Sequence, residues 1–160
     1  MRPFLVGFFI TISTLLVSQT TIQWAHEVTR FSSEFSRKEY SAKQVLGKPD
    51  KYPASGESPL AWATSTPEST RDEYVQVAFN VPMRVRQIAV AENINFGAIS
   101  EIVLIDTRGK RHTVYENENI KPAFNFSGRL FTHVLPRQTE YFVRELKLVI
   151  KPDKIPGMNQ

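Results

Sequence analysis

The side chains that could support catalysis are scattered along the chain. His26, His112 and His133 stand singly, without the H-x-x-x-H or H-E-x-x-H spacing of metal-binding helices. The sequence shows no G-x-S-x-G, P-loop or G-x-G-x-x-G motif. Many acids are present, but no pattern selects two carboxylates at the roughly 5–10 Å separation that glycoside hydrolysis requires. We therefore expect a protein that is not an enzyme.

Calcium is the ion that the sequence favours most. Segment 48–70 offers Asp50 and Glu57 as carboxylate ligands, with Ser55, Ser58 and backbone carbonyls close by. A hard cation takes 6–8 oxygen ligands of these kinds. We expect Asp50 and Glu57 to be candidate ligands of a structural calcium. The alternative is a proline-stiffened loop whose acids are solvated.

A second set of residues has the types that recognise carbohydrate. Tyr52 and Trp62 could offer stacking surfaces, and Glu92, Asn93 and Asn95 could offer hydrogen bonds. Each has a structural alternative. Trp62 could plug the core where the long loop meets the fold, and the run from Glu92 to Asn95 could be a turn held by side-chain bonds to the backbone.

These residues lie on or beside a series of short strands. Alternating or β-branched runs separated by turn signals predict strands at 73–80, 84–91, 99–106, 110–115, 128–134 and 141–150. Turns are predicted at 80–83, where Pro82 removes a donor, and at 107–109, where Gly109 can adopt positive φ. Such spacing is typical of an antiparallel sandwich or barrel.

Helix is scarce in this pattern. Segment 41–47 has a serine cap and a glycine stop and predicts one or two helical turns. The spacing of Val28, Phe31 and Phe35 allows helix or strand, and we favour an irregular first strand. Segment 48–70 contains four prolines and predicts a long ordered loop.

Composition indicates one globular domain. The chain has 160 residues, is 41% hydrophobic and carries a formal charge of +4. The absence of cysteine excludes disulfides, thiol catalysis and Cys-ligated metals. The basic residues are spread along the chain, whereas a nucleic-acid interface would cluster them with aromatic residues. We therefore expect no nucleic-acid partner.

The N-terminus reads as an export signal. Met1 and Arg2 give a positive start, and the uncharged run 4–17 matches the roughly 7–15-residue apolar core of a secretory signal. It falls short of the ~20 residues of a membrane-spanning helix. We expect a signal peptide at 1–18, a domain at 19–160, and a mature protein in the periplasm, at the outer-membrane surface or outside the cell. The alternative is an uncleaved anchor or a buried hydrophobic helix.

Several motifs together resemble a known family. YSAKQVLGKPD at 40–50, AWA at 61–63, EYVQV at 73–77 and IAVAE at 88–92 occur in the order of galactose-binding-like domains, the discoidin or coagulation-factor type C modules. The chain is most similar to exported modules of bacterial envelope proteins. The resemblance implies an all-β, antiparallel jelly-roll β-sandwich, ligand-binding loops at one end, and often a structural calcium near the long loop.

The chain departs from that family in two places. Asn95, Phe96 and Gly97 stand where the family tends to have Asn-Pro-Gly. The family continues after its P-G-x-N motif with a final apolar strand, whereas this sequence stops at Gln160. A jelly roll without that strand would leave an unpaired edge. We therefore expect a fragment, a truncated reading frame, or a module completed by another chain.

Together these features predict an exported, non-catalytic binding or adhesion module that recognises carbohydrate through loops at one end of the sandwich. A first alternative is a structural module of a larger cell-envelope assembly that binds a protein. A second is an accessory domain of a carbohydrate-active enzyme.

Overall fold

The protein is an all-β sandwich. The computed structural model describes residues 21–124 and 127–160, so the predicted signal peptide lies outside the described part. Within that part, seven strands form two antiparallel sheets and the helical structure consists of two short 3-10 turns. No helix among these residues has the length and apolarity to cross a bilayer.

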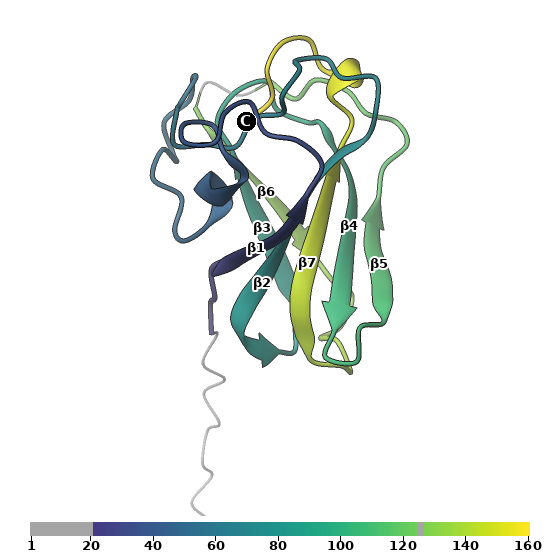
Figure 1. The fold of residues 1–160 in the computed structure, drawn as a ribbon. Helices are drawn as coiled ribbons and strands as arrows, with labels where there is room; N and C mark the ends of the chain where they lie inside the picture. Colours follow the sequence, from purple (N-terminus) through teal and green to yellow (C-terminus); the bar gives the residue numbers. More distant parts are fainter. Residues whose placement is uncertain (1–20, 125–126) are drawn as a thin grey trace, which may run out of the picture.

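The larger sheet has five strands, in the order β1-β2-β7-β4-β5. Their bounds, in chain order, are β1 Glu27–Phe31, β2 Glu73–Met83, β4 Ile99–Asp106, β5 Arg111–Glu116 and β7 Val143–Ile150. The smaller sheet pairs β3 (Gln87–Glu92) with β6 (Arg129–Val134). Figure 1 shows β3 and β6 as a ribbon behind the larger sheet.

The core fills the space between the two sheets. Ile102 and Leu104 of β4 and Leu146 and Leu148 of β7 are buried, and Phe131 of β6 belongs to the same cluster. Period-2 alternation places every second residue of a strand on one face, which is why these positions turn inward together. The prediction of strands at these positions is confirmed.

The strand β2 is longer than expected. We predicted a turn at 80–83, but β2 continues to Met83, so that prediction is wrong. The pairing of β2 with β7 breaks after Ala78 and resumes at Met83. Pro82 lies in this break, where no ladder hydrogen bond is required of it. The Gln23 side chain bonds instead to the Val81 backbone, at 2.8 and 3.1 Å.

The long connection between β1 and β2 is irregular but anchored. The predicted helical segment forms a 3-10 turn, Ala42–Val45, without a side-chain cap bond from Ser41. Beyond it the chain is tied to the rest of the fold by backbone bonds such as Tyr40 N to Pro59 O and Gly56 N to Asn93 O. The predicted long loop is therefore ordered by contacts far apart in sequence.

The two ends of the sandwich differ in character. At one end, which we call the loop end, segments 32–72, 93–98, 117–124 and 151–160 gather (Figure 1). At the other, the turn end, the connections are 84–86, 107–110 and 135–142. At the loop end, backbone hydrogen bonds join the segments to one another, for example from Lys151 N to Ala98 O and from Ala123 N to Phe96 O, each at 2.9 Å.

Gln160 lies at the loop end, beside the end of β3. Its carbonyl accepts a hydrogen bond from Asn93 N at 2.8 Å, and its own N–H donates to Ile94 O at 3.3 Å. β6 occupies one edge of β3, and within residues 21–124 and 127–160 no strand pairs with the other edge. That the sandwich lacks its last strand stays a prediction.

Candidate binding site

A cavity opens at the loop end where the two sheets separate. Its volume is about 200 Å³, and the residues that line it are Gly97, Ile99, Tyr115, Asn117, Asn119, Lys121, Ala123, Arg129 and Phe131. Typical ligand pockets occupy roughly 300–1,000 Å³. The cavity is therefore of a size to receive one ring or one substituent of a larger ligand.

Polar side chains with unpaired hydrogen-bonding groups among the described residues line one wall of the cavity. The backbone N–H of Asn117 donates to Ser100 O at 2.8 Å, and its side-chain Oδ1 accepts from Asn119 N at 3.1 Å. These two hydrogen bonds fix the position of Asn117. Within the described residues, the Nδ2 of Asn117, the side-chain amide of Asn119 and the Nζ of Lys121 have no partner. These groups are free to bind a ligand.

Aromatic rings and a guanidinium form the opposite wall. Tyr115 of β5 packs edge-to-face on Phe131 of β6, with ring centroids 5.1 Å apart. The guanidinium of Arg129 lies over the Phe131 ring at 5.4 Å. Such cation–π contact and ring packing hold the Arg129 side chain in one orientation. Tyr115 belongs to the larger sheet, and Arg129 and Phe131 belong to the smaller one, so the cavity exists only in the folded sandwich.

Glu92 is buried behind this wall and organises it. Its Oε2 lies 3.1 Å from Arg129 Nη1, an ion pair whose angles do not make it a hydrogen bond. Its Oε1 accepts a hydrogen bond from Gly97 N at 2.9 Å. Burial raises the pKa of Glu92, while the Gly97 N–H and the Arg129 charge act in the opposite direction. Glu92 thus links the loop after β3 to the cavity wall.

Gly97 is required at its position by backbone conformation and by space. Its φ is +108°, and a Cβ there would lie 2.5 Å from Lys121 O and 3.1 Å from Ala123 N. Only glycine permits this close approach of segments 93–98 and 117–124. The floor of the cavity depends on it.

The three predicted polar ligands at the end of β3 lie at the loop end, but none lines the cavity. Asn93 is buried, and its Nδ2 donates to Gly56 O at 2.6 Å. Asn95 has φ of +49°, and its Nδ2 donates to Met158 O at 2.8 Å. Glu92 stands behind Arg129, as described above. All three side chains hold neighbouring segments together, so a ligand role for them stays a prediction.

The two predicted aromatic ligands differ in exposure. Trp62 is buried, with 7% of its surface exposed, and its Nε1 donates to Ser33 O at 2.9 Å. The Trp62 indole therefore belongs to the core, which the sequence offered as the alternative to a ligand-stacking surface. Tyr52 is exposed, in the long loop next to a cis peptide bond to Pro53. Neither lines the cavity.

The predicted calcium ligands lie apart from any acidic cluster. Asp50 is exposed, and Glu57 Oε1 accepts a 2.7 Å hydrogen bond from the Tyr40 hydroxyl, which raises the pKa of Tyr40. Within the part of the chain that the structure describes, no three histidine or acidic side chains come together as a metal site. Calcium binding by Asp50 and Glu57 stays a prediction.

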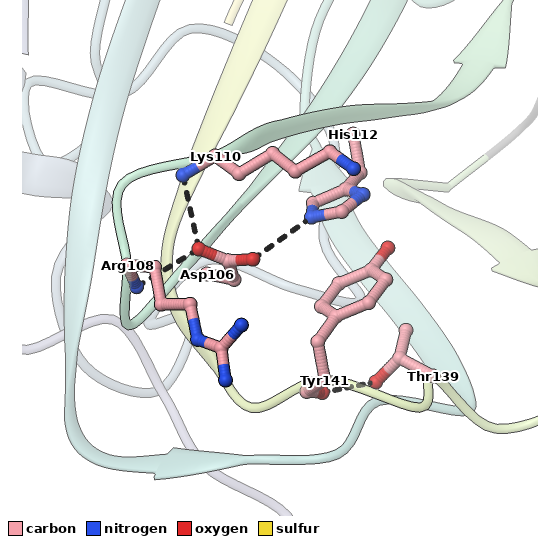
Figure 2. A network of polar contacts seen from close by, with 6 residues as sticks. All are labelled: Asp106, Arg108, Lys110, His112, Thr139 and Tyr141. Atoms are coloured by element: carbon pink, nitrogen blue, oxygen red, sulfur yellow. Dashed lines mark hydrogen bonds and ion pairs between the residues drawn. The ribbon is translucent and has the colours of Figure 1, made fainter.

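A polar network occupies the turn end (Figure 2). Asp106 Oδ1 accepts from the N–H groups of Arg108 and Lys110, each at 2.9 Å, and its Oδ2 lies 3.1 Å from His112 Nε2. These bonds, led by that to His112, lower the pKa of Asp106. The His112 ring stacks on Tyr141 with centroids 3.8 Å apart.

This network fastens the turn between β4 and β5 to the segment before β7. Burial, followed by the charge of Asp106, raises the pKa of Tyr141. A cavity of about 340 Å³ lies beside it, lined by Asp106, Thr107, Arg108, Glu140, Tyr141 and Phe142. Within this network the carboxylate of Asp106 and the imidazole of His112 are already paired with each other.

Sequence reasoning missed the residues that form the loop-end cavity. Asn117, Asn119 and Lys121 alternate directly after β5, which is a usable local signal. Arg129 and Phe131 alternate at the start of β6 in the same way. What the sequence does not reveal is that these two segments face each other from different sheets.

Comparisons with known proteins agree with this architecture. Residues 16–155 match the family model described as pappalysin-1, SD scarf domain, C-terminal. No curated protein matches the chain. Among solved structures, a chain of reduced XRCC1 bound to the DNA polymerase β catalytic domain has TM-score 0.55 and 9% identity, over 84% of this chain and 95% of that one.

Two further structures are similar. Chitosan-binding module 1 of a chitosanase/glucanase from Paenibacillus sp. IK-5 has TM-score 0.54 and 12% identity, over 84% of this chain and 92% of that one. The XRCC1 N-terminal domain in solution has TM-score 0.54 and 11% identity, over 85% of this chain and 94% of that one. At such low identity these neighbours show a shared jelly-roll-like β-sandwich.

Proposed function

Because the chain belongs to the family of the pappalysin-1 SD scarf domain, C-terminal, we propose that it is a non-catalytic, exported binding module that recognises carbohydrate. Its fold is that of a galactose-binding-like domain of the kind found in envelope proteins. Binding takes place at the loop end of the sandwich. The chain works by presenting a preformed surface to a ligand.

The observation that carries this proposal is the composition of the loop-end cavity. Tyr115, which is half-buried, supplies ring surface beside the buried Phe131, and the Nδ2 of Asn117 and the side-chain amide of Asn119 have no partner within the described residues. Carbohydrate recognition combines these two elements, because a sugar presents apolar C–H faces and a ring of hydroxyl groups. The chitosan-binding module is a precedent for sugar binding on a similar sandwich, and an accessory domain of a carbohydrate-active enzyme would work in the same way.

The test is binding to a glycan array by the full chain, with Asn119→Ala as the site variant and Asn80→Ala as the matched control. Both asparagines are exposed, and Asn80 lies on β2 outside the cavity. We expect glycan binding that Asn119→Ala weakens and Asn80→Ala leaves unchanged. Absence of glycan binding by a folded wild-type chain would refute the proposal. A parallel array with chelator tests the calcium prediction.

A protein-binding role is the second candidate, and a specific surface favours it. On the outer face of the β3–β6 ribbon, Leu130 is 42% and Val134 51% exposed, with the exposed Ala89 between them on the neighbouring strand. Exposed apolar patches mark protein contacts. An XRCC1 structure of similar fold was solved bound to a DNA polymerase β domain. In this role the module would belong to a larger envelope assembly.

A further inference from the structure

The charged side chains that line the loop-end cavity are both basic. They are Lys121 and Arg129, and no acidic residue of the described chain is part of the lining. Glu118 lies between the two lining asparagines in sequence but is not part of the lining. The nearest buried acid is Glu92, which stands behind Arg129.

Arg129 retains donors for a ligand. Its guanidinium has five N–H donors in a planar fork, whereas the ion pair with Glu92 engages only Nη1. Its side chain is 29% exposed and is oriented by Glu92 and by Phe131. An arginine held in this way can receive a carboxylate or sulfate through two parallel hydrogen bonds without losing much rotamer freedom.

Lys121 adds a second cation on the other wall. It is exposed, and its Nζ has no partner within the described residues. Its backbone is placed by the close approach of Lys121 O to Gly97. Together with Arg129 it gives the cavity a positive field that favours an anionic group over an ammonium group.

We infer that the loop-end cavity takes an acidic saccharide, with the carboxylate or sulfate of the sugar bound by Arg129 and Lys121 and the neighbouring hydroxyls bound by Asn117 and Asn119. The inference rests on the proposed carbohydrate-binding function and narrows it. A polyamine sugar such as chitosan fits poorly here, because its ammonium groups would meet two cations.

The test compares three oligosaccharides on one backbone: neutral dextran, carboxymethyl-dextran and dextran sulfate, measured by calorimetry against the full chain. Because the chain carries a net charge of +4, each site variant needs a control of equal charge. Lys121→Gln is paired with Lys110→Gln in the turn between β4 and β5. Arg129→Gln is paired with Arg137→Gln between β6 and β7.

We expect both anionic oligosaccharides, or one of them, to bind more tightly than neutral dextran. Lys121→Gln should weaken that binding roughly two- to fivefold, as for an exposed ion pair. Arg129→Gln should weaken it roughly tenfold or more, as for a lost charge-assisted hydrogen bond. The controls should bind as wild type does. Thermal unfolding checks that Arg129→Gln folds, and Lys121→Gln tests the inference without touching the core.

Three results would overturn the inference. Equal losses in Lys121→Gln and Lys110→Gln would show attraction by net charge alone. Preference for neutral dextran would reject the acidic ligand while leaving the proposed function intact. Failure of all three oligosaccharides, together with an empty glycan array, would reject both.

Discussion

Replacing Gly97 by alanine should destabilise the loop end of the sandwich. At φ of +108° an L-residue is strained by an amount of order 1–3 kcal/mol. The added Cβ would also lie 2.5 Å from Lys121 O, a backbone atom that moves only if segment 117–124 moves. Forced overpacking of this kind costs about 1–3 kcal/mol more. We expect Gly97→Ala to lower the free energy of unfolding by about 2–6 kcal/mol.

Gly109→Ala is the matched control. Gly109 also has positive φ, +81°, but a Cβ there would meet no atom within 4 Å. We expect Gly109→Ala to lower the free energy of unfolding only by the backbone strain of the left-handed conformation, about 1–2 kcal/mol. Urea unfolding with linear extrapolation measures both values. Equal losses in the two variants would refute the reasoning, because the contact with Lys121 would then contribute nothing.

Three further outcomes follow from the geometry. Trp62→Ala should lower the free energy of unfolding by about 3–5 kcal/mol, since Trp62 is buried and its Nε1 donates to Ser33 O. A variant that folds fully but no longer binds glycan would contradict the assignment of Trp62 to the core. Burial raises the pKa of Glu92 in the folded protein above its value in the unfolded chain. The stability that protonated Glu92 contributes should therefore be lost as pH rises through the folded-state pKa. Glu92→Gln should remove this decline, which a series of urea midpoints at different pH values measures. The hydrogen bond to His112 lowers the pKa of Asp106, so the stability that Asp106 contributes should be present above its unfolded value and lost as pH falls through the folded one. Asp106→Asn should flatten this acid limb, and an unchanged profile in either variant would contradict the assigned cause.

The sandwich could be predicted because its strands carry the pattern of their own burial. In β7 the buried residues Leu146, Leu148 and Ile150 face one way, and Glu145, Lys147 and Val149 face the other. In β4 all but one of the eight positions are buried, and five of the eight are apolar. The turn at Gly109 follows from local chemistry as well. The prediction of a turn at Pro82 was wrong because β2 does not pair with β7 at that position, and a strand can contain a proline where no ladder hydrogen bond is needed.

From the sequence, the candidate site could be assigned to one end of the sandwich but not to particular residues. Placing Glu92, Asn93 and Asn95 at the loop end was within reach of the strand pattern, but their tasks were not. The partners of Asn93 and Asn95 include Gln160 and Met158, more than 60 positions away. Local periodicity carries no information about such contacts. The cavity was missed for the same reason, because its lining combines β5 and the segment after it with β6, which lies in the other sheet.

Chemical-shift mapping by NMR tests the central claim most directly. The full chain would be titrated with the oligosaccharide that binds best, and its backbone amide signals followed. If the loop-end cavity is the binding site, the largest shifts will fall on Asn117, Asn119 and Lys121. Largest shifts at Arg108 and Tyr141 of the turn end, or around Tyr52, with the cavity amides unmoved, would contradict the account.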